Sequence, residues 1–339
     1  MNDLIIEYKI ANGSSKQEKF DSVATSIDLS SKEIVSIDTT TFEEFQHLLE
    51  INLRNNQLRN LDFQPFQRLT SLEKLDLSNN ELCHFDFEAI GNCKNLRYLS
   101  LGRNQISSVD LSPIRNLVNL EWLDLSRNSI QQLDLSHFCP LTNLQRLSLS
   151  YNSLGNVTLT PLANCKSLQK LRLTRIGMNE INLSFLVGCP HLQELSLAFN
   201  ELKTIDLTPL SGCRYLQILS LNRNDFGFLD LTPLSSCKNL RTLNLSDNRL
   251  PTIDLQPLSN CENLYSLILF KNQLNHIDLT SIGNISSLRG LNLRDNQLMS
   301  LDLRPLQFYS DMDEIDLRSN PLKELTTPSN PSPEKMLVD

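Results

Sequence analysis

A repeat of 24 residues runs through almost the whole chain and constrains its fold more than any other feature. Residues 192–215 read LQELSLAFNELKTIDLTPLSGCRY, and apolar residues occupy positions 1, 4, 6, 11, 14, 16, 19 and 22. The same positions are apolar in residues 216–239 and 240–263. Repeats begin at residues 24, 48, 72, 96, 120, 144, 168, 192, 216, 240, 264 and 288, and a partial thirteenth begins at Met312. A fixed period of this length indicates a solenoid, in which each turn packs on its neighbours.

The residues within one repeat predict its local structure. Positions 3 to 7 alternate outward and inward residues, which predicts a short strand. Position 9 carries an amide that can satisfy backbone groups where the chain bends inward. Asn occupies it in eleven repeats: Asn56, Asn80, Asn104, Asn128, Asn152, Asn200, Asn224, Asn248, Asn272, Asn296 and Asn320. Positions 14 to 16 predict a second extended segment. The Ser or Thr that often precedes Pro, as in Thr208-Pro209, indicates an N-cap before a short helical turn.

The pattern LxxLxLxxNxLxxIDLxPLxxC resembles the leucine-rich-repeat family across residues 24–325. The similarity is to intracellular members, such as the phosphatase-regulator type, which lack cysteine caps and have short outer segments. The resemblance implies an α/β repeat fold: a right-handed leucine-rich-repeat solenoid with a parallel sheet on its concave face. Short 3₁₀ or extended segments would lie on the convex side. Members of the family serve many binding roles.

The two ends of the chain fall outside the repeat. In residues 1–23, Leu4–Ile10 and Lys16–Phe20 are predicted to be strands joined by a turn at Asn12-Gly13, forming a hairpin that caps the first repeat. Twelve repeats and the partial thirteenth fill residues 24–325. Residues 326–339 read TTPSNPSPEKMLVD, and we expect a disordered tail because the segment is rich in Pro and Ser.

Charge and cysteine content limit the location and the partners. The net charge of -8 argues against a general nucleic-acid binder. No apolar run approaches the ~18 residues of a membrane helix, and the N-terminus predicts no signal peptide. Neither end contains a cysteine cluster, so a reducing, cytoplasmic location is expected. Six of the eight cysteines share position 22 and are expected to be buried thiols rather than zinc ligands: Cys93, Cys165, Cys189, Cys213, Cys237 and Cys261.

Position 15 carries a column of carboxylates that needs compensation. It is Asp in ten repeats: Asp38, Asp62, Asp86, Asp110, Asp134, Asp206, Asp230, Asp254, Asp278 and Asp302. The favoured interpretation is that each accepts hydrogen bonds from nearby backbone N–H groups; the alternative is a row of weak divalent-cation sites. Repeats 6 and 7 break the pattern, with Thr158 and Asn182 in place of Asp and Ile176-Gly177 in place of the Asn turn. This break is either tolerated drift or a distortion that shapes a binding surface.

The outward positions 3, 5, 7 and 8 carry a basic, aromatic centre in repeats 4 to 9. The only acids there are Asp124 and Glu194, whereas the flanking repeats are richer in acids. Trp122, the single tryptophan, would be costly at an outward position unless something covers it. Arg and aromatic residues are enriched at binding hot spots, although stacked pairs on a solvated face would look the same. The predicted partner-binding residues are Tyr98, Arg103, Trp122, Arg127, Arg146, Tyr151, Lys170, Arg172, Arg175, Phe199 and Arg223.

Catalytic signals are missing from the sequence. It contains no phosphate loop, HExxH, GxSxG, CxxC pair or glycine-rich nucleotide fingerprint. We therefore expect no enzyme, no cofactor and no metal. The favoured function is a monomeric protein-interaction scaffold or regulatory subunit that binds an acidic protein partner on its concave face. The alternative is a polyanion, such as single-stranded RNA or a phosphorylated ligand, bound through the same residues.

Overall fold

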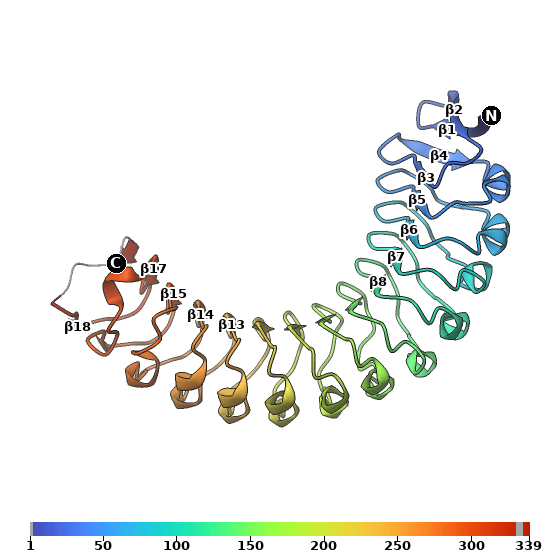
Figure 1. Ribbon diagram of the computed structural model, residues 1–339. Helices are drawn as coiled ribbons and strands as arrows, with labels where there is room; N and C mark the ends of the chain where they lie inside the picture. The colour runs from blue at the N-terminus through green and yellow to red at the C-terminus, as the bar shows by residue number, and fades with distance from the viewer. Residues whose placement is uncertain (1–2, 330–334) are drawn as a thin grey trace. The chain divides into compact units, whose positions relative to one another are not determined.

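The computed structural model describes residues 3–329 and 335–339 (Figure 1). The chain divides into two compact units, Met1–Leu168 and Gln169–Asp339, which we call the N-terminal unit and the C-terminal unit. Each unit is built from 24-residue turns, and each turn contributes a three-residue strand at positions 3 to 5 of the repeat. The solenoid predicted from the period is confirmed, and its strands and 3₁₀ helices are those that the resemblance to leucine-rich repeats implies.

The N-terminal unit contains one long parallel sheet. Its strands follow one another in the order β3–β5–β6–β7–β8–β9. Residues at the same position of successive repeats pair, so Tyr98 pairs with Trp122 and Trp122 with Arg146. In Figure 1 the helical turns of this unit fan outward from the strands, which places the sheet on the concave side. The strands are β3 (Ser26–Asp28), β5 (Glu50–Asn52), β6 (Lys74–Asp76), β7 (Tyr98–Ser100), β8 (Trp122–Asp124) and β9 (Arg146–Ser148).

The C-terminal unit repeats this arrangement. Its parallel strands follow the order β10–β11–β12–β13–β14–β15–β17–β19, and a second, two-stranded parallel sheet joins β16 (Ser300–Asp302) to β18 (Glu324–Thr326). The strands of the long sheet are β10 (Lys170–Arg172), β11 (Glu194–Ser196), β12 (Ile218–Ser220), β13 (Thr242–Asn244), β14 (Ser266–Ile268), β15 (Gly290–Asn292), β17 (Glu314–Asp316) and β19 (Lys335–Leu337).

Short 3₁₀ helices occupy the outer side of the turns. In the N-terminal unit they are η1 (Thr40–Glu44), η2 (Gln64–Arg68), η3 (Glu88–Ile90), η4 (Ser112–Asn116), η5 (Ser136–Phe138) and η6 (Thr160–Asn164). In the C-terminal unit they are η7 (Ser184–Gly188), η8 (Thr208–Gly212), η9 (Thr232–Ser236), η10 (Gln256–Asn260), η11 (Thr280–Ile282) and η12 (Tyr309–Asp311). Among the described residues, none of these helices has a side-chain N-cap hydrogen bond. The N-cap of η8 is Leu207, so the predicted N-cap role of Thr208 is wrong. Thr208 is the first residue of η8, and its N–H is accepted by Asp206 instead, 2.9 Å away.

The first 21 residues contain a hairpin. Strand β1 (Asp3–Ile10) pairs antiparallel with β2 (Ser15–Asp21), and β1 also pairs with β4 (Ile34–Ile37) of the first repeat. Ile6 is fully buried, and the Phe20 ring packs edge-on against Phe45 at 6.4 Å. The hairpin therefore contributes side chains that cover apolar residues of the first turns.

The end of the chain differs from the expected tail. Residues 330–334 lie outside the described part of the chain. Lys335–Leu337 form β19, which pairs with β17. The N–H of Leu317 donates to the Leu337 carbonyl at 2.8 Å, and the Tyr309 hydroxyl lies 2.9 Å from the Met336 sulfur. An apolar Met-Leu pair placed after the Pro- and Ser-rich segment supplies backbone groups to a strand edge that would otherwise face water.

The asparagine ladder at position 9 holds the inward bend as predicted. The Asn80 amide donates to the carbonyls of Leu53 and Leu77, while its oxygen accepts the N–H of Leu58. Each Asn thus joins position 6 of two turns to position 11 of the preceding turn. In repeat 7 the ladder lacks its own Asn, and Asn200 compensates by accepting three backbone N–H groups, those of Ile176, Gly177 and Met178.

Candidate protein-binding surface

Position 8 of the repeat, which is predicted to face outward, lies in the turn after each strand. Its residues have a left-handed backbone, with φ between 53° and 59°. The N–H of Arg103, for example, donates to the carbonyl of Ser126 in the next turn at 2.8 Å. We call these position-8 residues the turn column: Ser31, Asn55, Asn79, Arg103, Arg127, Tyr151, Arg175, Phe199, Arg223, Asp247, Lys271, Asp295 and Ser319.

In the N-terminal unit, position 3 carries a continuous stack of cations and rings. The Lys74 ammonium lies 5.7 Å from the centre of the Tyr98 ring. The Tyr98 and Trp122 rings meet edge to face at 4.8 Å, and the Arg146 guanidinium lies 4.9 Å from the Trp122 ring. Trp122 is half-buried by these contacts. Its outward position is thus covered from both sides by neighbouring turns, which the sequence could not specify.

A second basic group lies in the turn column of the same unit. The Arg127 guanidinium stacks 4.2 Å above the Tyr151 ring, and Arg103 is exposed one turn before it. Among the described residues of this unit, the ion pairs involve other bases, so Arg103, Arg127 and Arg146 lack a carboxylate partner. We call six of the predicted site residues the basic-aromatic face: Tyr98, Arg103, Trp122, Arg127, Arg146 and Tyr151.

Small residues at positions 5 and 7 lie between the stack at position 3 and the arginines at position 8. Ser100 and Ser150 are buried, and Gly102 is so closely packed that an added Cβ would lie 2.7 Å from the Asp124 carboxylate. Asp124 itself accepts the N–H of Ser126 at 2.9 Å. The Asp124 carboxylate therefore accepts a backbone N–H at position 7 and forms no ion pair with Arg103, Arg127 or Arg146.

In the C-terminal unit, acids of the chain itself neutralise most of the predicted bases. The buried carboxylate of Glu194 accepts from Arg172 at 2.6 Å and lies 3.6 Å from the Lys170 ammonium. Burial raises the pKa of Glu194, but hydrogen bonds and charge from Arg172 outweigh it and hold the pKa below its usual value. The sequence identified this acid but not its double pairing.

The turn column of the C-terminal unit shows the same effect. Arg223 stacks on Phe199 at 4.6 Å, and its guanidinium also pairs with Asp247 at 3.1 Å. Asp247 pairs in turn with Lys271 at 2.9 Å. Arg175 is exposed, and among the described residues no ion pair joins it to a carboxylate. The predicted site residues of this unit therefore present less uncompensated charge than the basic-aromatic face.

The aspartates of position 15 accept backbone hydrogen bonds, as the favoured interpretation predicts. Each of the ten, and Asn182 in repeat 7, accepts the N–H two residues further on at 2.8 to 3.0 Å. The Thr232 hydroxyl and its N–H lower the pKa of Asp230. Among the described residues, no cluster of three or more His, Cys, Asp or Glu side chains could hold a metal ion.

The cysteines of position 22 are buried thiols that are not in disulfides, as predicted. Burial raises the pKa of Cys93, Cys213 and Cys261 to about 12, and that of Cys189 and Cys237 to about 11. Thiols with such values carry almost no thiolate at neutral pH, and the thiolate is the form that binds metals and attacks disulfides. The remaining two cysteines, Cys83 and Cys139, are exposed.

A second asparagine ladder, which the predictions above do not include, lies at position 24 of the repeat. At position 24 the side-chain amides of Asn95, Asn119, Asn143, Asn239 and Asn263 each donate to a carbonyl of the preceding turn, at 2.8 to 3.2 Å. The signal was a column of Asn at one outer position. In repeats 7 and 8 His191 and Tyr215 occupy this position instead, and their ring centres lie 5.7 Å apart.

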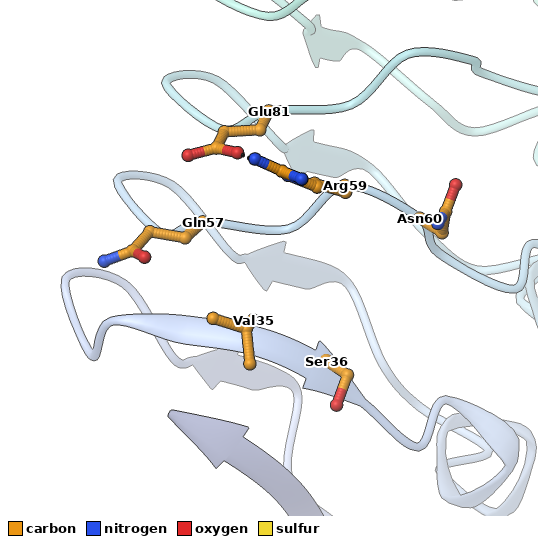
Figure 2. Close-up of a pocket in the computed structure, with 6 residues that line it drawn as sticks. All are labelled: Val35, Ser36, Gln57, Arg59, Asn60 and Glu81. Carbon is orange, nitrogen blue, oxygen red and sulfur yellow. Dashed lines mark hydrogen bonds and ion pairs between the residues drawn. The ribbon is translucent and has the colours of Figure 1, made fainter. Parts of the chain in front are cut away.

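A shallow depression of about 410 Å³ lies beside β4 in the N-terminal unit (Figure 2). It is lined by Val35, Ser36, Gln57, Arg59, Asn60 and Glu81. Figure 2 shows the Arg59 guanidinium pointing toward the Glu81 carboxylate, and the two groups form an ion pair of 2.8 Å. None of the predicted site residues lines it, and its one base is already paired. No helix among the described residues is long and apolar enough to cross a membrane.

Comparisons with known proteins identify the family. A family model described as leucine-rich repeat matches residues 23–82, 92–154, 166–226 and 214–274, whereas no curated protein sequence matches the chain. Among solved structures, a leucine-rich-repeat protein of Leptospira interrogans is 26% identical, with a TM-score of 0.75, over 84% of this chain and 70% of that one. An internalin, InlF of Listeria monocytogenes, is 26% identical with a TM-score of 0.66, over 87% and 88%.

The Arabidopsis receptor kinase HAESA, solved with the peptide hormone IDA and the co-receptor SERK1, is also similar. It is 26% identical with a TM-score of 0.76, over 88% of this chain and 50% of that one. The chain thus spans about half of the HAESA chain. Because the family model covers more than half of the sequence, the protein belongs to the leucine-rich-repeat family, whose members are generally binding scaffolds.

Proposed function

We propose that the protein is an interaction scaffold or regulatory subunit that binds an acidic segment of a partner protein on the basic-aromatic face. The observation that carries this proposal is the contrast between the two units. Lys170, Arg172 and Arg223 are paired with acids of their own chain, whereas Arg103, Arg127 and Arg146 have no such partner among the described residues. Like charges held close together repel, and an acidic ligand relieves that repulsion.

Stacking prepares the arginines for such a ligand. A guanidinium that lies flat on a ring keeps its five N–H donors around its edge, where a carboxylate can accept two of them. The Arg127 and Arg146 guanidinium groups lie over the Tyr151 and Trp122 rings, 4.2 and 4.9 Å from the ring centres. Ring contacts also reduce the side-chain entropy that binding would otherwise remove. Arg175 and Phe199 of the C-terminal unit stay sequence-based predictions and are not part of the basic-aromatic face.

The same contacts disfavour the alternative of single-stranded RNA. Binding of this kind depends on stacking successive bases on open aromatic faces. Here the Trp122 ring lies between Tyr98 and Arg146, and one side of Tyr151 is covered by Arg127. We further propose that the protein is a non-enzymatic monomer in the cytoplasm, a location that suits six buried cysteines outside any disulfide.

The test compares two double charge reversals within the N-terminal unit. Arg127→Glu with Arg146→Glu should weaken capture of the protein's partner from native lysate by roughly 100-fold or more, as expected for opposed charges at a contact. Lys94→Glu with Arg115→Glu makes the same change in net charge at exposed positions outside the face and should leave capture intact.

The fold of each variant is checked by circular dichroism and thermal unfolding. If Arg127→Glu with Arg146→Glu retains full affinity, the ligand binds elsewhere. A salt titration separates partner types, because a polyanion complex weakens log-linearly with a slope of about -0.7 per neutralised phosphate of a single strand. We expect a shallower dependence for an acidic protein segment.

A further inference from the structure

We propose that Arg103 and Arg127 together bind a phosphoryl group carried by a serine or threonine of the partner protein. This inference rests on the function proposed above and names the ligand chemistry at one point of the basic-aromatic face. It concerns two residues of the N-terminal unit that occupy the same position in consecutive turns.

The backbone places the two arginines side by side. Both have the left-handed conformation of the turn column, with φ of 57° and 55°. The N–H of Arg103 donates to Ser126 at 2.8 Å, and the N–H of Asn104 donates to the Arg127 carbonyl at 3.1 Å. Neighbouring turns of a parallel sheet are about 4.8 Å apart. The two side chains therefore leave a fixed backbone in the same direction at a spacing that one anion can bridge.

No acid of the described chain neutralises this pair. Asp124, the nearest acid of the face in sequence, accepts the Ser126 N–H and packs against Gly102. The turn column on the N-terminal side of Arg103 is neutral: Asn79 donates to Asn55, which donates to Ser31. The charged side chains of Arg103 and Arg127 therefore follow three neutral side chains that hydrogen-bond to one another.

The C-terminal unit shows how this column accommodates an anion. There Asp247 occupies the same position and contacts a base on each side, Arg223 at 3.1 Å and Lys271 at 2.9 Å. Bases in the turn column therefore reach an acidic group one turn away without any change in backbone conformation. At Arg103 and Arg127 both positions are taken by bases, so the anion has to come from another molecule.

A phosphoryl group fits this pair better than a carboxylate. A phosphorylated side chain carries a charge of about -1.5 to -2 and three acceptor oxygens, so it can neutralise both guanidinium groups. A carboxylate neutralises only one of them. The Arg127 guanidinium lies over the Tyr151 ring, 4.2 Å from its centre, and a guanidinium can donate two parallel hydrogen bonds to one phosphoryl group.

The test measures binding of the full chain to three sets of fluorescein-labelled degenerate peptides by fluorescence polarisation. The sets share acidic flanking residues and differ only at the central residue, which is phosphoserine, glutamate or serine. We expect the phosphoserine set to bind roughly tenfold or more tightly than the glutamate set, because the dianion engages both arginines. Arg103→Gln and Arg127→Gln should each abolish this preference, and Arg103→Lys should reduce it because lysine cannot bind two oxygens side by side.

Lys271→Gln is the matched control, because it removes a charge from the turn column at a residue already paired with Asp247. It should keep the preference for phosphoserine. Equal affinity for the glutamate and phosphoserine sets, lost together in the Gln variants, would overturn the phosphoryl assignment while leaving the acidic partner in place. If all three sets bind equally and no variant changes binding, both proposals fail. Tighter, arginine-dependent binding of a labelled oligouridylate would assign the site to nucleic acid instead.

Discussion

Among single residues, carboxylate and carboxamide side chains perform the same task at two positions of the repeat. At position 5, Asp76 and Asn52 each accept the backbone N–H two residues further on, at 3.0 and 3.1 Å. At position 15, Asp230 and Asn182 do the same at 2.9 Å. The fold therefore uses these side chains as oxygen acceptors, and their negative charge is secondary.

Asp230→Asn is accordingly expected to leave the urea midpoint of unfolding nearly unchanged, because the amide oxygen can still accept the Thr232 N–H. Asp230→Ala removes the acceptor and should lower the midpoint. Equilibrium unfolding followed by circular dichroism distinguishes the two. An Asn variant as destabilised as the Ala variant would show that the charge itself matters.

The same aspartates predict a direction for acid unfolding. Hydrogen bonds lower the folded-state pKa of Asp110, Asp206, Asp230 and Asp278 below that of the unfolded chain. Such groups contribute their full stability above the unfolded pKa of about 3.9, and the contribution is lost as the pH falls through the folded-state pKa. Stability should therefore fall as the pH drops below about 4, and Asp230→Asn should flatten that decline slightly.

At the scale of the repeat, the period predicted the strands and the position-9 ladder but not the conformation of the turn column. Gly or Asn would have indicated a left-handed turn, and only Asn55 and Asn79 do so. Arg, Tyr and Phe at this position carry no such signal. The outer turns were misassigned for a related reason: Thr208-Pro209 looks like an N-cap, yet the acceptor is Asp206, which the sequence analysis placed in a separate column.

A glycine substitution separates the stability of the turn from its binding role. A non-glycine residue in the left-handed region costs about 1–2 kcal/mol, while glycine adds about 0.4–1 kcal/mol of unfolded-state entropy. Arg103→Gly should therefore raise the free energy of unfolding by roughly 0.5 kcal/mol while weakening partner binding. Asn79→Gly, where asparagine already tolerates the conformation, should change stability less. A clear loss of stability in Arg103→Gly would mean that its side chain also supports the fold.

Over the whole chain, the sequence located the basic centre but not how its charges are compensated. Columns follow from the period, so Arg103, Trp122 and Arg146 could be placed on one face. Ion pairing depends on which rotamer reaches which neighbour. Glu194 forms ion pairs with both Lys170 and Arg172, and Asp247 forms one with Arg223. Those pairs divide the predicted site into a neutralised part and the basic-aromatic face.

The thiols provide a test that involves the whole fold. In the native protein, Cys83 and Cys139 should react rapidly with Ellman's reagent, and the six buried cysteines should react only on unfolding. Burial and a raised pKa both suppress the thiolate, for instance that of Cys213. All eight should titrate in denaturant. Rapid labelling of more than two thiols at neutral pH would contradict the buried column.

The constant backbone of the turn column bears on how such a protein can acquire new ligands. Thirteen turns place Ser, Asn, Arg, Tyr, Phe, Asp or Lys at position 8, and φ varies by only 6° among them. The side chain at position 8 can therefore change without a change in the backbone conformation of the turn. Successive mutations can exchange one ligand preference for another while each intermediate still folds, and the side chains of one column can be transplanted onto another solenoid of the same period as a unit.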